Sequence, residues 1–282
     1  MRKIKLKIPA KINLTLDVVG TEGKFHEIKS LVTSVNDYDT ITIEKRADNQ
    51  INLTMKGLNV DCSVPDNNAY KAAKLFAETF STGGVNVTVN KKIPVGGGMG
   101  GSSADIAGVL KGMNELYEVD LDMGELADKL GSDVRYMLGG GYAVLSGRGQ
   151  NVEEQFISKT LYFILIKEEK IISARSCYKK YDALGKILRP CTKTAVKALL
   201  GGNFEKYSEV AKNDLYPAAC TFVRDIEANV KNLKRAGANV ALMTGSGSVV
   251  FGVFETAKER DKIFKKLKPL YGKGLIKAKT VF

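Results

Sequence analysis

The chain has 282 residues, of which 44% are hydrophobic and 26% charged, and its formal net charge is +12. This length and apolar content suffice for a sizeable core in one large or two moderate domains, which excludes a fibrous or disordered chain. The longest clean apolar run, Leu161 to Ile166, falls far below the roughly eighteen residues that a membrane span needs.

The first half of the chain mixes strand and helix patterns. Lysines alternate with apolar residues from Lys3 to Ile8, which is typical of a strand and not of a secretion signal. The expected strands cover residues 3–8, 12–18, 39–46, 50–56 and 84–90, with a strand pair following at 141–146. The expected helices cover residues 68–80, 104–117 and 123–130.

Lys11 and Asn13 lie in a stretch whose apolar residues alternate. Ile12 and Leu14 fall on one face of the expected strand, so Lys11 and Asn13 share the opposite face. Such a pair suits an anionic or hydroxylated ligand. The polar face of an ordinary surface strand is the alternative.

His26, the only histidine in the chain, follows Phe25. An aromatic ring beside a histidine suits stacking on, and hydrogen bonding to, a flat ring, whereas a lone histidine is more often structural. Both interpretations stay open at this point.

The segment from Pro94 to Asp105 contains five glycines and two serines and leads into a helical pattern. Glycine lets the backbone approach an anion closely, and a helix N-terminus carries partial positive charge, so the segment predicts a phosphate-binding loop. It lacks the Gly-Lys-Ser/Thr ending of a P-loop and the spacing of the dinucleotide fingerprint. A flexible surface loop is the alternative.

Asp133 follows Gly131 and Ser132, where the preceding helix is expected to end. An acid at such a turn serves as a helix N-cap as readily as a base.

After residue 150 the pattern of elements starts afresh. Strands are expected at 160–167, 239–243 and 249–254, and helices at 173–184, 193–200, 218–236 and 256–267. Antiparallel strand patterns with few βαβ repeats favour an α+β chain of two lobes, with a boundary near residues 150–160. The last helix carries many lysines beside an apolar stripe, which indicates a solvated helix face.

The four cysteines form no Cys-x-x-Cys pair, which favours free thiols in a cytoplasmic protein over a zinc site or a disulfide framework. The positive charge fits an anionic substrate, nucleic acid or an anionic membrane, and does not decide among them. A second glycine turn, Thr244 to Ser248, separates two apolar strands and by itself indicates a hairpin.

Four segments taken together resemble, in order and spacing, the GHMP family of small-molecule kinases over nearly the whole chain. They are Pro-Ala-Lys-Ile-Asn-Leu at 9–14, the Pro-x3-Gly-Met-Gly-Gly-Ser-Ser loop at 94–103, Gly-Ser-Asp-Val at 131–134 and Gly-Ser-Gly-Ser at 245–248. The resemblance implies a two-lobed GHMP-kinase fold. Residues 1–155 would form an N-terminal ATP-binding domain like domain 2 of ribosomal protein S5, and residues 156–282 a ferredoxin-like C-terminal domain.

The resemblance also implies the residues of an ATP site. The ATP-binding set would be Pro94, Gly96, Gly97, Gly98, Met99, Gly100, Gly101, Ser102, Ser103 and Ala104, with Asn67 near the adenine. Ser103 would also help to ligate the Mg²⁺ that accompanies ATP. Asp133 would act on the acceptor hydroxyl as its base or orienting group, and Lys11 would hold Asp133 ionised.

Within the family, the Phe25-His26 pair and Tyr178 match the residues that hold a cytosine ring. The implied reaction transfers the γ-phosphoryl group of ATP to the 2-hydroxyl of a cytidine-diphosphate-linked methylerythritol, in the non-mevalonate route to isoprenoid precursors. The implied substrate-binding residues are Asn13, Phe25, His26, Tyr178, Gly245 and Ser246. We expect no nucleic-acid or membrane partner, and a monomer or homodimer.

Two alternatives stay open. A GHMP kinase acting on another small alcohol would keep the same catalytic groups. A non-catalytic member of the fold that binds a nucleotide or RNA would not need both Lys11 and Asp133, and this chain has both.

Overall fold

The computed structural model describes residues 2–23, 25–185 and 189–282. Met1, Lys24 and residues 186–188 lie outside the described residues. The chain forms two compact units, each built from separate segments. Unit 1 consists of Met1–Ala10, Asp37–Val95 and Gly100–Gly140, and unit 2 of Lys11–Asn36, Gly96–Met99 and Gly141–Phe282. Two long strands, β1 (Lys3–Asn13) and β3 (Phe25–Lys45), therefore contribute residues to both units.

Unit 1 contains a sheet that joins the second half of β3 to β5 (Val85–Lys91) and β4 (Ile51–Gly57). Strand β5 is antiparallel to β3, with Ile43 opposite Val87, and parallel to the edge strand β4, with Leu53 opposite Val87. The buried positions of β5 are Val85, Val87 and Val89, followed by Lys91 at its end. β-Branched side chains such as valine pack well on a half-buried pleated face.

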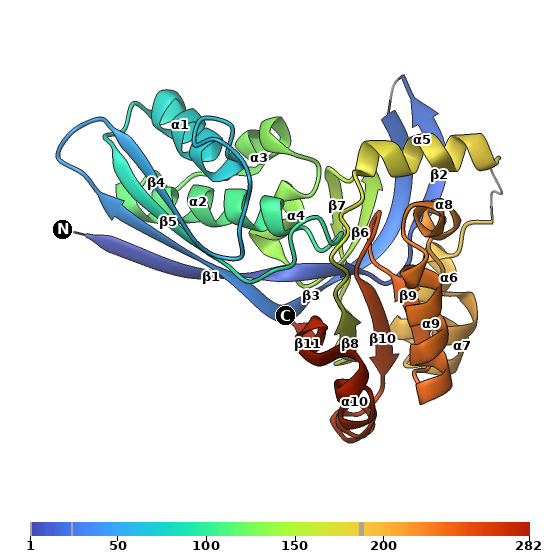
Figure 1. The fold of residues 1–282 in the computed structure, drawn as a ribbon. Helices are drawn as coiled ribbons and strands as arrows, with labels where there is room; N and C mark the ends of the chain where they lie inside the picture. The colour runs from blue at the N-terminus through green and yellow to red at the C-terminus, as the bar shows by residue number, and fades with distance from the viewer. Residues whose placement is uncertain (1, 24, 186–188) are drawn as a thin grey trace. The chain divides into compact units, whose positions relative to one another are not determined.

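Helices in the described part of unit 1 (Figure 1) are α1 (Asn68–Phe80), α2 (Gly101–Tyr117), α3 (Gly124–Leu130) and α4 (Val134–Gly139). Helix α2 packs closely on the sheet at Gly108, where an added Cβ would lie 2.7 Å from Ile41 and 2.9 Å from Ile8. The close approach fixes the axis of α2, and hence the position of its N-terminus, relative to β3.

Unit 2 contains a four-stranded antiparallel sheet in the order β11–β8–β10–β9. Its strands are β8 (Tyr162–Ile166), β9 (Val240–Met243), β10 (Val250–Phe254) and β11 (Leu275–Val281). Helices α9 (Asp225–Ala236) and α10 (Ala257–Tyr271) pack on it, so strands and helices follow the ferredoxin-like β-α-β-β-α-β plan.

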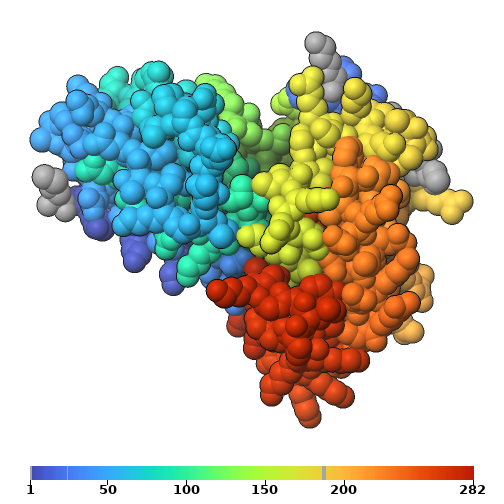
Figure 2. Space-filling view, in the orientation of Figure 1, coloured from blue at the N-terminus to red at the C-terminus, as the bar shows by residue number. Residues whose placement is uncertain are grey.

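Helix α10 lies on the surface (Figure 2), with Leu267 buried and its lysines exposed. The expected solvated face of a terminal helix is thereby confirmed. The helix extends to Tyr271 and not only to Leu267.

The remainder of unit 2 surrounds the first half of β3. Strand β3 pairs with β2 (Asp17–Glu22) and β6 (Tyr142–Gly147), and β6 pairs with β7 (Asn151–Glu154). Strand β11 also pairs with β3, with Thr280 opposite Val35. The helices are α5 (Ala174–Leu184), α6 (Thr192–Leu200), α7 (Phe204–Val210) and α8 (Tyr216–Phe222), and a 3₁₀ turn covers Gly272–Gly274.

The α+β class is confirmed, whereas several expected elements are wrong in extent. No single strand covers 12–18, because β1 ends at Asn13 and the backbone N–H groups of Leu14 and Thr15 both turn toward the Leu31 carbonyl. The expected helix 218–236 is two helices, since buried Val223 adopts an extended backbone between them. The helix expected from 104 begins at Gly101.

Among the residues that the structure describes, no helix is long and apolar enough to cross a membrane. The expected division at residues 155 and 156 stays a prediction.

Candidate functional site

The first part of the glycine loop, Gly96 to Met99, packs backbone to backbone against the second glycine turn within unit 2. Gly98 has φ +75°, and an added Cβ would lie 2.2 Å from the Thr244 carbonyl oxygen. The N–H of Val249 donates to the Gly97 carbonyl at 3.2 Å. Only glycine permits so close an approach, so the two turns form one unit of backbone.

The second turn joins β9 and β10 as the expected hairpin, and Asn213 fixes its shape. The Asn213 side-chain amide donates to the carbonyls of Met243 at 2.7 Å and Gly245 at 2.9 Å. Gly245 is buried, whereas Ser246 is partly exposed. Two residues of this turn, Gly245 and Ser246, are predicted to bind substrate. Of these two, Ser246 is the one whose side chain a ligand can reach.

Lys11 and Asn13 end β1 beside these turns, and both side chains are almost fully buried. The Lys11 ammonium donates to Asn13 Oδ1 at 2.7 Å, as expected for neighbours on one strand face. The backbone N–H of Lys11 donates to the Met99 carbonyl, and that of Asn13 to Thr244 Oγ1, both at 3.0 Å. A buried cation is therefore anchored against both glycine turns.

The second part of the glycine loop lies in unit 1 and opens helix α2. Gly100 caps the helix at φ +73°, and the first intrahelical bond runs from Ala104 N–H to the Gly100 carbonyl. The N–H groups of Gly101, Ser102 and Ser103 come before that bond, so the helix itself does not use them. Three such donors at the positive end of a 17-residue helix fit a phosphate group.

The remaining residues predicted to bind ATP differ in exposure. Gly96 and Ser102 are exposed, Ser103 is partly buried, and Pro94, Gly97, Met99 and Ala104 are buried. The Ser102 hydroxyl accepts a 2.5 Å hydrogen bond from the Asn68 side chain. The buried members shape the loop, and the exposed ones are those that a ligand can touch.

A buried charged cluster lies beneath the start of α2. The Lys91 ammonium donates to Asp39 Oδ2 at 2.5 Å, to Asp105 Oδ2 at 2.8 Å and to the Gly101 carbonyl at 3.0 Å. Burial raises the pKa of the Asp105 carboxyl to about 7; the Asp39 carboxylate adds to the rise, and Lys91 opposes it.

Asn67 and Asp133 both stand at helix starts in unit 1. Asn67 caps α1 by accepting the Ala69 N–H at 2.9 Å and is mostly buried. Asp133 precedes α4 and makes no side-chain cap bond. The Asp133 carboxylate is thus not consumed in capping, unlike the Asn67 oxygen.

His26 and Tyr178 contact each other directly in unit 2. Their rings stack at 4.6 Å with an interplanar angle of 20°. His26 Nε2 lies 2.8 Å from Asp182 Oδ1, a neighbour that orients the imidazole. Phe25 is 55% exposed, and the Arg148 guanidinium lies 4.6 Å from its ring centre. The aromatic residues thus offer flat surfaces at one end of β2 and β3.

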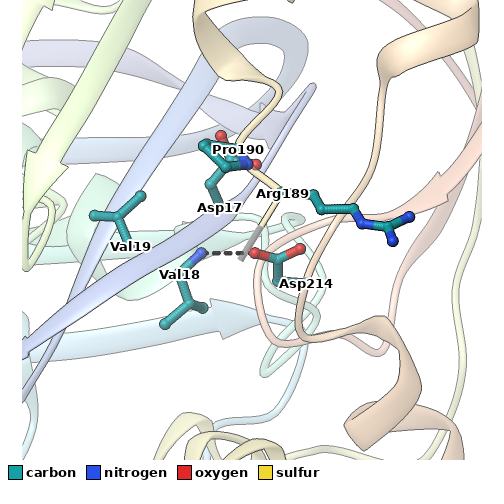
Figure 3. Close-up of a pocket in the computed structure, with 6 residues that line it drawn as sticks. All are labelled: Asp17, Val18, Val19, Arg189, Pro190 and Asp214. Atoms are coloured by element: carbon teal, nitrogen blue, oxygen red, sulfur yellow. Dashed lines mark hydrogen bonds between the residues drawn. The ribbon is translucent and has the colours of Figure 1, made fainter. Parts of the chain in front are cut away.

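A small cavity of about 110 Å³ lies near the start of β2 and is lined by Asp17, Val18, Val19, Arg189, Pro190 and Asp214 (Figure 3). Its carboxylates already have partners. Asp17 accepts the N–H groups of Cys191 and Thr192, and Asp214 accepts that of Val18 at 2.9 Å. The cavity contains none of the residues predicted to bind a ligand.

Each unit therefore gathers part of the predicted site. Unit 2 contains Lys11, Asn13, Phe25, His26, Gly96 to Met99, Tyr178, Gly245 and Ser246, and unit 1 contains Asn67, Pro94, Gly100 to Ala104 and Asp133. The buried cluster of Lys91, Asp39 and Asp105 could not be predicted from the sequence. Its sequence signal is limited to a lysine three residues before the glycine segment, Lys91, and the aspartate that ends it, Asp105.

A backbone cradle that opens a long helix, in an α+β chain with a ferredoxin-like part, fits a small-molecule kinase. The sequence matches the GHMP kinases N terminal domain over residues 67–146 and the GHMP kinases C terminal domain over residues 196–273. The chain belongs to the GHMP kinase family, which uses ATP.

Its similarity extends to particular enzymes. The chain is 32% identical to 4-diphosphocytidyl-2-C-methyl-D-erythritol kinase of Bacillus cereus (strain B4264) over 94% of this chain and 93% of that protein. A crystal structure of 4-(cytidine 5'-diphospho)-2C-methyl-D-erythritol kinase superposes with a TM-score of 0.82 at 25% identity, covering 98% of both chains. The homoserine kinase from Cytophaga hutchinsonii shares the fold, with a TM-score of 0.76 at 16% identity over 100% of this chain and 95% of that one.

Proposed function

We propose that this kinase transfers the γ-phosphoryl group of ATP to the 2-hydroxyl of 4-diphosphocytidyl-2-C-methyl-D-erythritol, a step in isoprenoid precursor biosynthesis. The observation that carries the proposal is the stacked pair of His26 and Tyr178 beside exposed Phe25. Flat rings together with a hydrogen-bonding imidazole suit a cytosine base, which the smaller alcohols of other GHMP kinases lack. The chain is 32% identical to a kinase of that name over 94% of its length, which supports the same substrate.

The triphosphate of ATP binds residues 94–104 in this proposal. The helix N–H groups of Gly101, Ser102 and Ser103 donate hydrogen bonds to phosphate oxygens, and Asn67 lies near the adenine. Among the described residues no cluster of His, Cys, Asp and Glu could hold a metal by itself. This fits a Mg²⁺ that arrives with the nucleotide and keeps water and phosphate ligands, with Ser103 as its protein ligand. Bound Mg²⁺ would neutralise phosphate charge.

The acceptor contacts residues of unit 2. Phe25, His26 and Tyr178 hold the cytosine ring, and Asn13 the sugar alcohol. Gly245 and Ser246 contribute from the second glycine turn. Because His26 covers one face of Tyr178 at 4.6 Å, the base stacks on Phe25 or on the other face of Tyr178, or displaces His26.

Asp133 accepts the proton of the 2-hydroxyl as this oxygen attacks the γ-phosphorus and the bond to the leaving ADP breaks. Lys11 supplies positive charge to the reacting phosphoryl group. Phosphoryl transfer depends on alignment and charge stabilisation more than on covalent chemistry. The hydrogen bond from Lys11 to Asn13, at 2.7 Å, supports this role because it holds the ammonium in one position.

The test is ADP release by the purified protein with Mg-ATP and a panel of acceptors: the cytidine compound, mevalonate, phosphomevalonate, homoserine and galactose. We expect turnover with the cytidine compound alone. Turnover with another acceptor would keep the kinase and overturn the cytosine pocket. ATP binding with no turnover on any acceptor would refute the proposed reaction.

We further propose that the enzyme acts in the cytoplasm as a monomer or homodimer. Free cysteines and small polyanionic substrates support this setting. Size-exclusion chromatography with light scattering tests the oligomeric state.

A further inference from the structure

The Lys91, Asp39 and Asp105 side chains form an ion cluster that the proposed reaction does not use. Lys91 is 3% exposed as a side chain, Asp39 0% and Asp105 9%. Burying three charged groups is costly, and well-packed apolar residues would join strand and helix at least as firmly. Such a cluster calls for an explanation other than stability.

The cluster touches the backbone at both ends of the glycine loop. Where the loop begins, Asp39 Oδ1 accepts the N–H groups of Lys92 at 2.6 Å and Ile93 at 2.9 Å. Where the loop ends, the Lys91 ammonium donates to the Gly101 carbonyl at 3.0 Å. Asp39 Oδ2 and Lys91 are themselves in contact, so a two-residue link joins the two ends.

We propose that Asp39, Lys91 and Asp105 form a loop clamp that positions both ends of the glycine loop for ATP. The inference rests on the proposed function, because it assigns the phosphates to residues 94–104. A loop whose ends are fixed before binding does not have to be ordered by the ligand, which favours affinity. The clamp residues act through the loop backbone, and we class them as positioning residues.

Asp105 completes the clamp from the helix side. It lies in the first two turns of α2, and its Oδ2 shares the Lys91 ammonium with Asp39. Without Asp105 the ammonium would have one carboxylate and one carbonyl, and could turn away from Gly101. The second carboxylate therefore holds Lys91 between the strand and the helix.

Asp39→Asn is the test variant, because it keeps size and shape. One side-chain oxygen becomes an NH₂ group, so a donor must face either the Lys91 ammonium or the N–H groups of Lys92 and Ile93. Either orientation breaks the link between the two loop ends. We expect about tenfold weaker Mg-ATP binding by calorimetry without acceptor, since a small misplacement of a binding group is costly. The KM for the cytidine acceptor should stay within about twofold.

Asp17→Asn is the matched control. Asp17 is equally buried, also accepts two backbone N–H groups, at Cys191 and Thr192, and lies 3.6 Å from a lysine, Lys212. Asp17 lies outside the loop, so the Asp17→Asn variant should lose stability without a change in ATP affinity.

Three results separate the possibilities. Weaker ATP binding in Asp39→Asn but not in Asp17→Asn supports the clamp. If both variants bind ATP with equal affinity, and the wild type binds and turns over ATP, the clamp is overturned and the proposed function stays intact. A wild type that binds no Mg-ATP overturns both.

Asp105→Asn keeps the inference testable if Asp39→Asn does not fold. Its side-chain oxygen can still accept from Lys91, while its charge is gone. We expect faster amide hydrogen exchange in residues 95–101 than in wild type, with helix α1 unchanged as the internal reference. Unchanged exchange in the loop would contradict the clamp.

Discussion

Substituting Gly98 by alanine separates the two glycine turns without removing any polar group. At φ +75° the new Cβ would lie 2.2 Å from the Thr244 carbonyl oxygen and 3.2 Å from the Gly247 nitrogen. Because real Cβ contacts essentially never fall below 3.0 Å, the backbones must move apart. The neighbour is backbone and not a flexible side chain, so nothing can rotate out of the way.

The cost has two parts. An alanine in the left-handed region costs about 1 kcal/mol. Separating the turns weakens the hydrogen bond from Val249 N–H to the Gly97 carbonyl and removes the Gly98 carbonyl from reach of the Thr244 hydroxyl, at about 1 kcal/mol each. The free energy of unfolding should therefore fall by about 3 kcal/mol. The KM for ATP should rise, because the loop to which we assign the phosphates would move.

Gly202→Ala is the matched control, since Gly202 has φ +71° and no atom within 4 Å of an added Cβ. It lies in the turn between α6 and α7, and should lose only the backbone part, about 1 kcal/mol. Urea unfolding measures both variants, and steady-state kinetics with varied ATP measures the loop. Equal stability losses and equal KM values in the two variants would refute the packing of one turn on the other.

Three further predictions concern chemistry, recognition and pH. Asp133→Asn should keep ATP binding and the fold while abolishing turnover, and a near-normal kcat would remove Asp133 from the mechanism. Phe25→Ala and Tyr178→Ala should each raise the KM for the cytidine substrate, a stacking contact being worth on the order of 1 kcal/mol, with the KM for ATP nearly constant; equal effects on both substrates would place the base elsewhere. Burial and the Asp39 carboxylate raise the pKa of Asp37 from 3.8 to about 6, although the nearby Lys92 ammonium lowers it. The stability contributed by its proton is complete below pH 3.8 and lost as pH rises through about 6, so Asp37→Asn should flatten this part of the urea-stability profile. If the free energy of unfolding changes by the same amount between pH 4 and 6 in the wild type and in the variant, this assignment is contradicted.

Local patterns predicted many elements because each depends on nearby residues. Helix α1 occupies residues 68–80 as expected, since Asn67 supplies a cap and apolar residues recur at helical spacing. The break at Val223 escaped prediction. Apolar residues recur at helical spacing on both sides of it, and burial of Val223 in the unit 2 core fixes the extended backbone between the two helices.

The site was predictable where a motif carries its own geometry. Lys11 and Asn13 share a strand face, and their contact follows from strand periodicity. The loop clamp was not predictable, because Asp39 lies 52 residues before Lys91 and only the sheet register brings them together. The stacking of His26 on Tyr178 likewise depends on where α5 packs, which no local pattern encodes.

The path of β3 through both units has a consequence for synthesis on the ribosome. Unit 1 needs no residue beyond Gly140, so it can fold while later residues are still being added. Unit 2 includes residues 11–36, yet β11 reaches its partner Val35 only after residues 275–281 have emerged. Strands β2 and β6 between them pair with residues 25–33 of β3 once residue 147 has emerged, whereas Ser34 and Val35 keep an unpaired edge until β11 has been synthesised. A chaperone that shields exposed strand edges would act on this nascent chain chiefly during that interval.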